Sequence, residues 1–185
     1  ETYRQTMARF MYQSGASMEP VFAAAKVAQK RIALAEGEDD RVLRAAQIIV
    51  DENLGRPVLV GRPDVINPRI ESLGLRLENG RNCEIVCFEN DRRYEESWRE
   101  YYDLVRRSGV TPTLAREGMR NRSTLIASML LRRGDVDAML CGTSGAFAEH
   151  LNYVRQVIGL RDGVHTLGTM NMVIPGGRPL FMCDA

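Results

Sequence analysis

A strand-helix-strand unit over residues 31–61 constrains the fold of this chain more than any other feature. The segment reads RIALAEGEDDRVLRAAQIIVDENLGRPVLVG, and its apolar runs Ile32–Ala35 and Pro57–Val60 predict two short buried strands. Between them, apolar residues recur with the i, i+3, i+4, i+7 spacing of an amphipathic helix, at Val42, Ala45, Ala46 and Ile49. Such a unit needs parallel strands joined by a right-handed crossover, so it indicates an α/β protein.

The same alternation of strands and helices continues along the chain. The runs CEIVCF and VDAMLCG predict two further strands. Near the C-terminus, LGTMNMVI and RPLFMCDA flank Pro175-Gly176-Gly177 and predict a hairpin, which indicates a change of sheet near Gly142. The predicted fold class is therefore a three-layer α/β/α unit with a mostly parallel sheet, followed by a second α/β domain that is only partly present. The four parallel strands are expected at Ile32–Ala35, Val58–Val60, Ile85–Phe88 and Ala138–Cys141, with helices on both faces.

Proline and hydroxyl residues mark the expected helix starts. Thr111-Pro112 predicts a helix with a hydroxyl cap and a proline in its first turn, and Asn67-Pro68 predicts another helix start with an asparagine cap and a first-turn proline. In the N-terminal leader, Gly15 is expected to interrupt helical structure, and Pro20 is expected in the first turn of the helix that follows.

Composition excludes several classes of partner. The 25 basic and 24 acidic side chains nearly cancel, so the global charge predicts neither nucleic-acid nor membrane binding. No apolar run approaches the roughly 20 residues that cross a bilayer. The four cysteines form no CxxC pair, so no metal site is predicted and they are expected to be reduced thiols of a cytoplasmic protein.

The loop after the first strand, Glu36-Gly37-Glu38-Asp39-Asp40, carries four carboxylates where a nucleotide fold often holds a phosphate. A helix N-terminus has free N–H groups and a partial positive charge, so Asp39 or Asp40 is expected to cap the following helix. Glu36 and Glu38 would repel a phosphate, and the chain contains no GxGxxG or P-loop motif. The loop is therefore predicted to be structural and to leave ligand binding to a later loop.

Two features are candidates for binding an anionic ligand. Arginines concentrate between residues 106 and 133, and guanidinium groups pair with phosphate oxygens, which makes Arg107 and Arg122 candidate ligand residues. The turn Thr143-Ser144-Gly145 follows a strand, opens a helix and has hydroxyl and N–H donors. The alternatives are solvated arginines and an ordinary capped turn. His150 and His165 match no catalytic motif and are expected to pack or to face solvent.

The combination of these segments resembles phosphotransacetylases (phosphate acetyltransferases). The resemblance runs through AEGEDDRVLRAAQIIVDENLGRPVLVGRP, VRRSGVTPTLAREGMRNRSTLIASMLLRRGDVDAMLCG and the helix LNYVRQVIGL. The leader FMYQSGASMEPVFAAAK is similar to the junction that precedes the phosphotransacetylase-like C-terminal domain of large NADP-dependent malic enzymes.

The resemblance implies a fold like that of isocitrate and isopropylmalate dehydrogenases and three parts: a helical leader at 1–30, an α/β domain at 31–141 and the start of a second α/β domain at 142–185. It implies a regulatory role, with acetyl-CoA or a related CoA ester bound by Arg107, Arg122, Thr143, Ser144 and Gly145. A homo-oligomer, at least a dimer, and an upstream malic-enzyme domain with its own NADP and divalent metal are the further expectations. No cofactor is expected in this segment.

The chain departs from the phosphotransacetylase pattern at the expected reaction site. The family's turn carries a histidine and a hydroxyl and leads into a TxRPAxQ helix, whereas here Asn152 replaces the arginine, Tyr153 replaces the proline and Phe147 adds bulk. The family's catalytic Ser-Arg and Asp elements fall beyond Ala185. The segment is therefore expected to contain no catalytic residue. The alternatives are a segment of an active phosphate acetyltransferase and a ligand-free oligomerisation domain.

Overall fold

A computed structural model describes residues 15–89, 91–175 and 178–183 of the chain. The chain divides into two compact units, which are described separately: one spans Gln29–Gly159, and the other comprises the two ends of the chain, up to Ala28 and from Leu160. None of the helices in the described ranges is long and apolar enough to cross a membrane.

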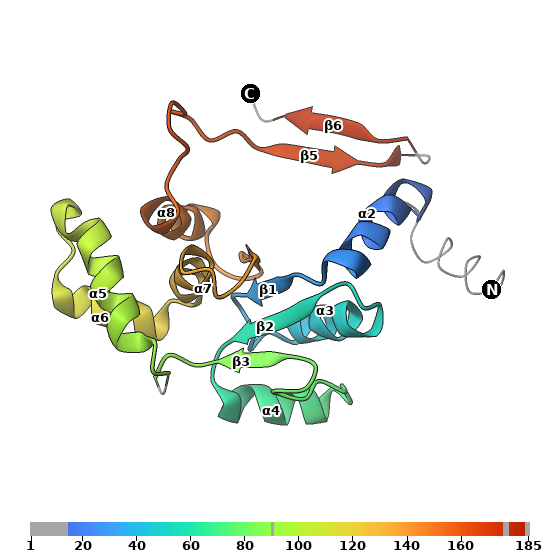
Figure 1. The fold of residues 1–185 in the computed structure, drawn as a ribbon, viewed down its shortest axis with the longest axis horizontal. Coiled ribbons are helices and arrows are strands. Elements are labelled where there is room, and N and C mark those ends of the chain that lie inside the picture. Colours follow the sequence, from blue (N-terminus) through green and yellow to red (C-terminus); the bar gives the residue numbers. More distant parts are fainter. Residues whose placement is uncertain (1–14, 90, 176–177, 184–185) are drawn as a thin grey trace. The chain divides into compact units, whose positions relative to one another are not determined.

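The unit Gln29–Gly159 is built on a four-stranded sheet (Figure 1). Its strands are β1 (Arg31–Leu34), β2 (Arg56–Val60), β3 (Glu84–Val86) and β4 (Ala138–Leu140), in the spatial order β3-β2-β1-β4. Every neighbouring pair is parallel. The predicted parallel sheet is thus confirmed, because each strand comes from one of the four apolar runs of the sequence.

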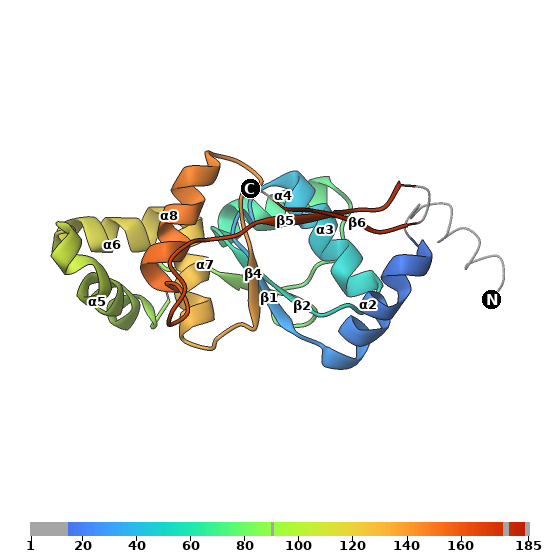
Figure 2. The ribbon, with the colours of Figure 1, turned by 90° about the horizontal axis from the view of Figure 1, so that it is seen from above.

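Helices cover both faces of this sheet. Figures 1 and 2 show α3 and α7 on opposite sides of β1. The helices of this unit are α3 (Asp40–Asp51), α4 (Pro63–Ser72), α5 (Tyr94–Val105), the 3-10 turn η1 (Arg106–Ser108), α6 (Pro112–Asn121), α7 (Ser123–Arg132) and α8 (Phe147–Val157).

Alternate residues of the strands pack into two separate hydrophobic cores, one on each face of the sheet. Leu34 and Leu59 pack with the buried residues of α3 and α4 in one cluster. Their neighbours Ala33, Val58 and Val60 point to the other face and join a second cluster, formed with residues of α5, α6, α7 and α8. Because successive side chains of a strand point to opposite faces, a sheet that is apolar at every position must be covered on both sides. The three-layer prediction is therefore confirmed.

The prediction for the start of α4 was wrong. This helix begins at Pro63, after Arg62 with extended backbone, and Pro68 lies inside it rather than in its first turn. Pro63 fits the first helical position because its missing N–H would have no partner there. Pro68 does remove an internal hydrogen bond, but Ile66 and Ile70 are 0% and 6% exposed and anchor the helix on the sheet.

The second unit contains one described helix and one hairpin. Helix α2 spans Gly15–Ala28, and Pro20 lies inside it rather than in its first turn. The predicted interruption of helical structure at Gly15 involves the residues before it, which lie outside the described residues. Strands β5 (Met170–Val173) and β6 (Leu180–Cys183) pair antiparallel, which confirms the predicted hairpin and the change of sheet. The proposed domain division at residue 142 stays a prediction, and α8 packs against α7 within the unit Gln29–Gly159.

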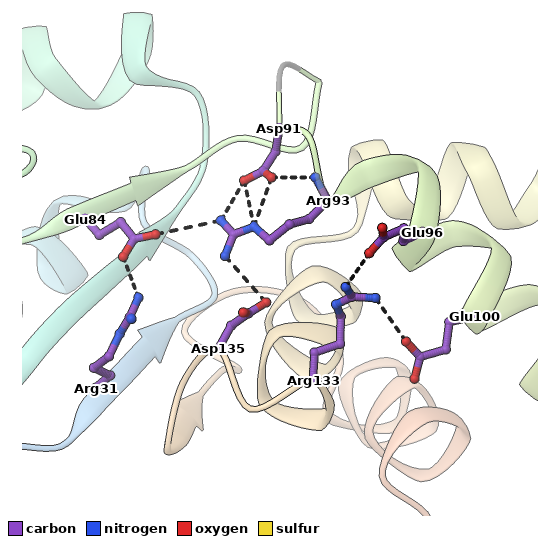
Figure 3. A network of polar contacts seen from close by, with 8 residues as sticks. All are labelled: Arg31, Glu84, Asp91, Arg93, Glu96, Glu100, Arg133 and Asp135. Atoms are coloured by element: carbon purple, nitrogen blue, oxygen red, sulfur yellow. Dashed lines mark hydrogen bonds and ion pairs between the residues drawn. The ribbon is translucent and has the colours of Figure 1, made fainter.

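One arginine ties the sheet to the segments that follow β3 and precede β4 (Figure 3). Arg93 lies 2.6 Å from Asp91, 3.5 Å from Asp135 and 3.7 Å from Glu84, and Glu84 in turn lies 2.5 Å from Arg31 at the start of β1. The Arg93 side chain is 21% exposed and that of Asp91 is 14% exposed. Arg93 therefore joins segments from three separate regions of the chain in a partly buried ion-pair network.

Candidate ligand site at the carboxyl ends of the parallel strands

The strand order places a topological switch point between β1 and β4. From β1 the chain moves to β2 and β3 on one side, and it returns to β4 on the other side of β1. In open parallel sheets, ligands bind outside the carboxyl ends of the strands at such a point. The two loops that meet there are the acidic loop after β1 and the Gly142–Gly145 turn after β4.

A pocket of about 500 Å³ lies at this end of the sheet. Its walls come from the segments that follow β1, β2 and β3 and from the start of α7. Ser144 of the turn after β4 completes the lining, together with Arg62, Arg69, Arg120 and Ser123. The pocket therefore combines the predicted turn with three arginines and with four carboxylates, Glu36, Glu38, Asp39 and Glu89.

The carboxylates of the acidic loop are engaged within the chain. Asp39 is the N-cap of α3 and accepts a hydrogen bond from the N–H of Arg41, which confirms the predicted capping. The Arg41 guanidinium also binds this carboxylate, and the pKa of Asp39 is lowered to about 2 chiefly by that side-chain hydrogen bond. Glu38 accepts two hydrogen bonds from the Arg62 guanidinium at 3.0 Å, which hold the pKa of Glu38 below its usual value.

The turn after β4 is held in place by the acidic loop and the helix that follows it. The backbone N–H of Gly142 donates to Glu36 Oε1 at 2.9 Å, and the carbonyl of Thr143 accepts from Arg41 at 3.0 Å. The carbonyl of Ser144 lies 2.7 Å from His150 Nε2. The two loops, which the sequence pattern treated as separate, thus form one connected structure.

The structure brings some of the predicted ligand residues together and separates others. Thr143, Ser144 and Gly145 share the turn, and Ser144 lines the pocket. Arg122, the N-cap of α7, lies 3.0 Å from Glu149 of α8 and lines a second pocket, between α5, α6 and α8, instead of this one. Arg107 lies in η1, is exposed, and lines neither pocket.

The other arginines of the predicted cluster do not converge on one point. Arg133 lies 2.7 Å from Glu96 and Arg132 lies 3.0 Å from Glu100, so both tie α7 to α5; Figure 3 shows the Arg133 contacts. Arg120 stacks over the ring of Tyr94 at 5.1 Å and also lines the pocket. Most of the cluster is therefore structural, and Arg120 is its member at the pocket.

Sequence reasoning missed Arg62 and Arg69. Arg62 directly follows Gly61 at the end of β2, and Arg69 lies on α4. The available signal for Arg62 was its position just beyond a predicted parallel strand, where ligand-binding side chains gather. Within the described ranges, no group of three or more His, Cys, Asp or Glu side chains is arranged to hold a metal ion.

Comparison with known families gives this geometry a context. The family model described as phosphate acetyl/butaryl transferase matches residues 16–185. The chain belongs to this family. Two solved structures share its fold. The EutD phosphotransacetylase from Staphylococcus aureus has a TM-score of 0.73 and 22% identity, and the match covers 89% of this chain and 49% of that one. A phosphotransacetylase from Streptococcus pyogenes has a TM-score of 0.72 and 21% identity, and the match covers 84% of this chain and 47% of that one. The predicted phosphotransacetylase-like fold is confirmed.

Curated relatives fall into two groups. The chain is 42% identical to the NADP-dependent malic enzyme of Haemophilus influenzae and 43% identical to that of Escherichia coli, in each case over all 185 residues and 24% of the relative. It is 33% identical to the phosphate acetyltransferase of Clostridium acetobutylicum over 159 residues, which are 85% of this chain and 46% of that protein. The chain thus spans about a quarter of the malic enzymes that it matches, and the resemblance stated for its leader and its helices is confirmed.

Proposed function

We propose that this chain is a regulatory, acetyl-CoA-responsive and oligomerising part of a cytoplasmic NADP-dependent malic enzyme. The observation that carries the proposal is identity of 42–43% with NADP-dependent malic enzymes over the whole chain, against 33% over 159 residues with a phosphate acetyltransferase. In the proposed parent, a separate malic-enzyme domain converts malate and NADP to pyruvate, carbon dioxide and NADPH with a divalent metal. The ligand of this segment is then an effector and not a substrate.

The chemistry of the pocket suits an acetyl-CoA molecule. Helix α7 begins at Ser123, and its N-cap, Arg122, makes no side-chain cap hydrogen bond, so the first N–H groups of the helix are available beside Ser123 and Arg120. Helix N-termini and arginines both favour phosphate groups. Ser144 and the neighbouring backbone of the turn supply neutral donors for the acyl end. Because Glu38, Asp39 and Asp40 are each paired with an arginine, the acidic loop need not repel the ligand.

We further propose that this segment does not transfer acetyl groups. Asn152 stands where the family pattern has an arginine, and Phe147 stands where a hydroxyl would be useful. Both side chains are exposed, Phe147 to 70%, and neither is a cation or a hydroxyl. The leading alternative is a segment of an active phosphate acetyltransferase, which the family model and the solved structures favour. A ligand-free oligomerisation domain is the other alternative, and ligand titration separates it from the proposal.

Calorimetric titration of acetyl-CoA into the chain tests the proposed function. Arg122→Ala should weaken binding by about 1.5–3 kcal/mol if the guanidinium contacts a phosphate. The matched control is Arg81→Ala, because Arg81 is an exposed arginine that also forms one ion pair, with Glu78, and lies before β3, at the opposite end of the strands. Arg107→Ala reports whether the site extends to η1.

Three results of these experiments would contradict parts of the proposal. Absence of acetyl-CoA binding by the unchanged chain would refute an effector role. Equal losses for Arg122→Ala and Arg81→Ala would refute the placement of the phosphate site. Production of acetyl-CoA from acetyl phosphate and CoA, above a protein-free blank and abolished by Arg122→Ala, would favour the phosphate acetyltransferase alternative.

A further inference from the structure

His150 lies beneath the turn of the proposed ligand site, and both of its ring nitrogens are engaged. Nε2 lies 2.7 Å from the carbonyl oxygen of Ser144, and Nδ1 lies 2.7 Å from Thr124 Oγ1. The His150 side chain is only 14% exposed, and Thr124 is 3% exposed in α7. The ring therefore bridges α7 and the turn from its place in α8.

The partners fix which nitrogen carries the proton in the neutral ring. A carbonyl oxygen only accepts hydrogen bonds, so His150 Nε2 must carry the hydrogen and donate it to Ser144. The lone pair is then on Nδ1, which can accept the hydroxyl hydrogen of Thr124. Glu36 Oε1 lies 3.8 Å from Nδ1, and it also accepts the N–H of Gly142. If Nδ1 gains a proton beside this carboxylate, Nε2 still donates to Ser144.

This hydrogen bond sets the direction of one peptide unit. In a planar trans peptide the C=O and the N–H point in opposite directions. Because the Ser144 carbonyl points at the His150 ring, the N–H of Gly145 points away from the ring. Gly145 has φ of 95°, and a Cβ at this position would lie 3.0 Å from His150 Nε2. The close approach of the ring thus requires glycine, a residue that also tolerates flipping of this peptide unit.

We propose that His150 is a positioning residue: through its Nε2–H it fixes the Ser144–Gly145 peptide so that the Gly145 N–H faces the acyl oxygen of a bound CoA thioester. The ligand part of this inference rests on the proposed function. Without His150 the peptide has no anchor, and the donor to the acyl oxygen is lost in part of the molecules. At the start of α7, the hydrogen bond of His150 is to the side-chain hydroxyl of Thr124, so the proposed phosphate contacts with the backbone N–H groups there should be largely kept.

Two measurements test the inference. In the chain labelled with ¹⁵N-histidine, NMR at neutral pH should show His150 as the Nε2–H tautomer with both nitrogens hydrogen-bonded. The only other histidine, His165, is exposed and serves as the internal reference. Calorimetry should show that His150→Ala weakens acetyl-CoA binding by about three- to tenfold, the effect of one hydrogen bond, and weakens CoA binding by less. Added imidazole should restore the affinity for acetyl-CoA.

The result for CoA separates positioning from a general loss of structure, because CoA lacks the acyl oxygen. An Nδ1–H tautomer, or equal losses for CoA and acetyl-CoA, would overturn the inference. His150→Gln keeps an N–H donor and should lose less affinity than His150→Ala; the reverse order would also overturn the inference. If the unchanged chain binds neither ligand, the proposed function fails, and the tautomer measurement still decides whether His150 holds the turn.

Discussion

Replacing Arg93 with methionine should destabilise the unit Gln29–Gly159 more than removing any exposed ion pair. Methionine keeps the apolar stem of the side chain and removes the guanidinium, which contacts Asp91, Asp135 and Glu84. Asp91 is left 14% exposed without its main partner. Asp135 Oδ2 is buried, makes no hydrogen bond in the described structure, and loses the cation 3.5 Å away.

The magnitude follows from the burial of these charges. Breaking a buried pair by removing one partner costs about 3–5 kcal/mol, because a charge stays in a poorly solvated site. The partial exposure of Asp135 and Glu84, at 30% and 32%, lets water replace part of the lost interaction. We therefore expect a loss near 3 kcal/mol for Arg93→Met, at the lower end of that range. Arg81→Met, which removes a pair exposed to 76% and 56%, should cost less than about 1 kcal/mol.

The loss of stability in Arg93→Met should depend on pH. Burial raises the pKa of Asp91, but the hydrogen bonds and charge of Arg93 outweigh burial and hold the pKa below the usual 3.8. A carboxyl with a lowered pKa in the folded state adds stability above pH 3.8, and this stability is lost as the pH falls through its folded pKa. In Arg93→Met the side-chain hydrogen bonds and the charge of Arg93 are lost, while burial, the backbone N–H of residue 93 and the charge of Arg92 remain. The pKa of Asp91 should therefore rise, and acid should relieve the uncompensated charge. The stability difference between the two proteins should therefore shrink below about pH 4.

Urea unfolding followed by tryptophan fluorescence measures this difference. The single tryptophan, Trp98, is buried in α5 and so reports on the unit that contains Arg93. Titrations at pH 7 and at pH 3.5 give the two stability differences. A loss at pH 7 no larger than that of Arg81→Met, or a difference that grows in acid, would show that Arg93 does not hold buried carboxylates together.

Three further predictions concern packing, capping and assembly. Ile66→Ala should cost about 2–5 kcal/mol in the same urea assay, because Ile66 is fully buried against the sheet and its loss leaves a cavity; a loss under 1 kcal/mol would mean that α4 is not anchored there. The Asp39 carboxyl should titrate near pH 2 by NMR, and the stability that it adds above pH 3.8 should be lost as the pH falls through 2; a titration at pH 3.8 or above would contradict the Arg41 contact. Light scattering at micromolar concentration should give at least the mass of a dimer, since Leu140 and Phe147 of the unit Gln29–Gly159 are 60% and 70% exposed and exposed apolar surface often marks an interface; a monomer would refute this.

The sheet could be predicted from sequence because its signal is local. Each strand is a short apolar run, and the connections between β1 and β2 and between β2 and β3 each contain a recognisable helix. The start of α4 could not be placed in this way, because Pro63 and Pro68 are both compatible with a helix start. The choice depends on how Ile66 and Ile70 meet the sheet, which is a tertiary contact.

The candidate site was predicted by residue type at some positions only. Ser144 was proposed because hydroxyls suit anionic ligands, and it lines the candidate pocket; Arg122 was proposed for its guanidinium group, and it lines the second pocket. The contact between His150 and Thr124 was not predicted, because the two residues are 26 positions apart and no motif joins them. The pairing of Arg62 with Glu38, 24 residues apart, was hidden for the same reason.

The long-range pairs also explain the unusual acidic loop. Four carboxylates would repel a phosphate if they were free, yet the structure gives each a partner: Glu36 binds the N–H of Gly142, Glu38 binds Arg62, Asp39 binds Arg41 and Asp40 binds Arg69. The loop therefore orients cations at the rim of the pocket and ties down the turn after β4. Three of the four carboxylates are thus paired with an arginine before any ligand arrives, and Glu36 holds the turn through a neutral N–H. For the proposed anion site, this arrangement leaves the α7 N-terminus and Arg120 to meet the ligand.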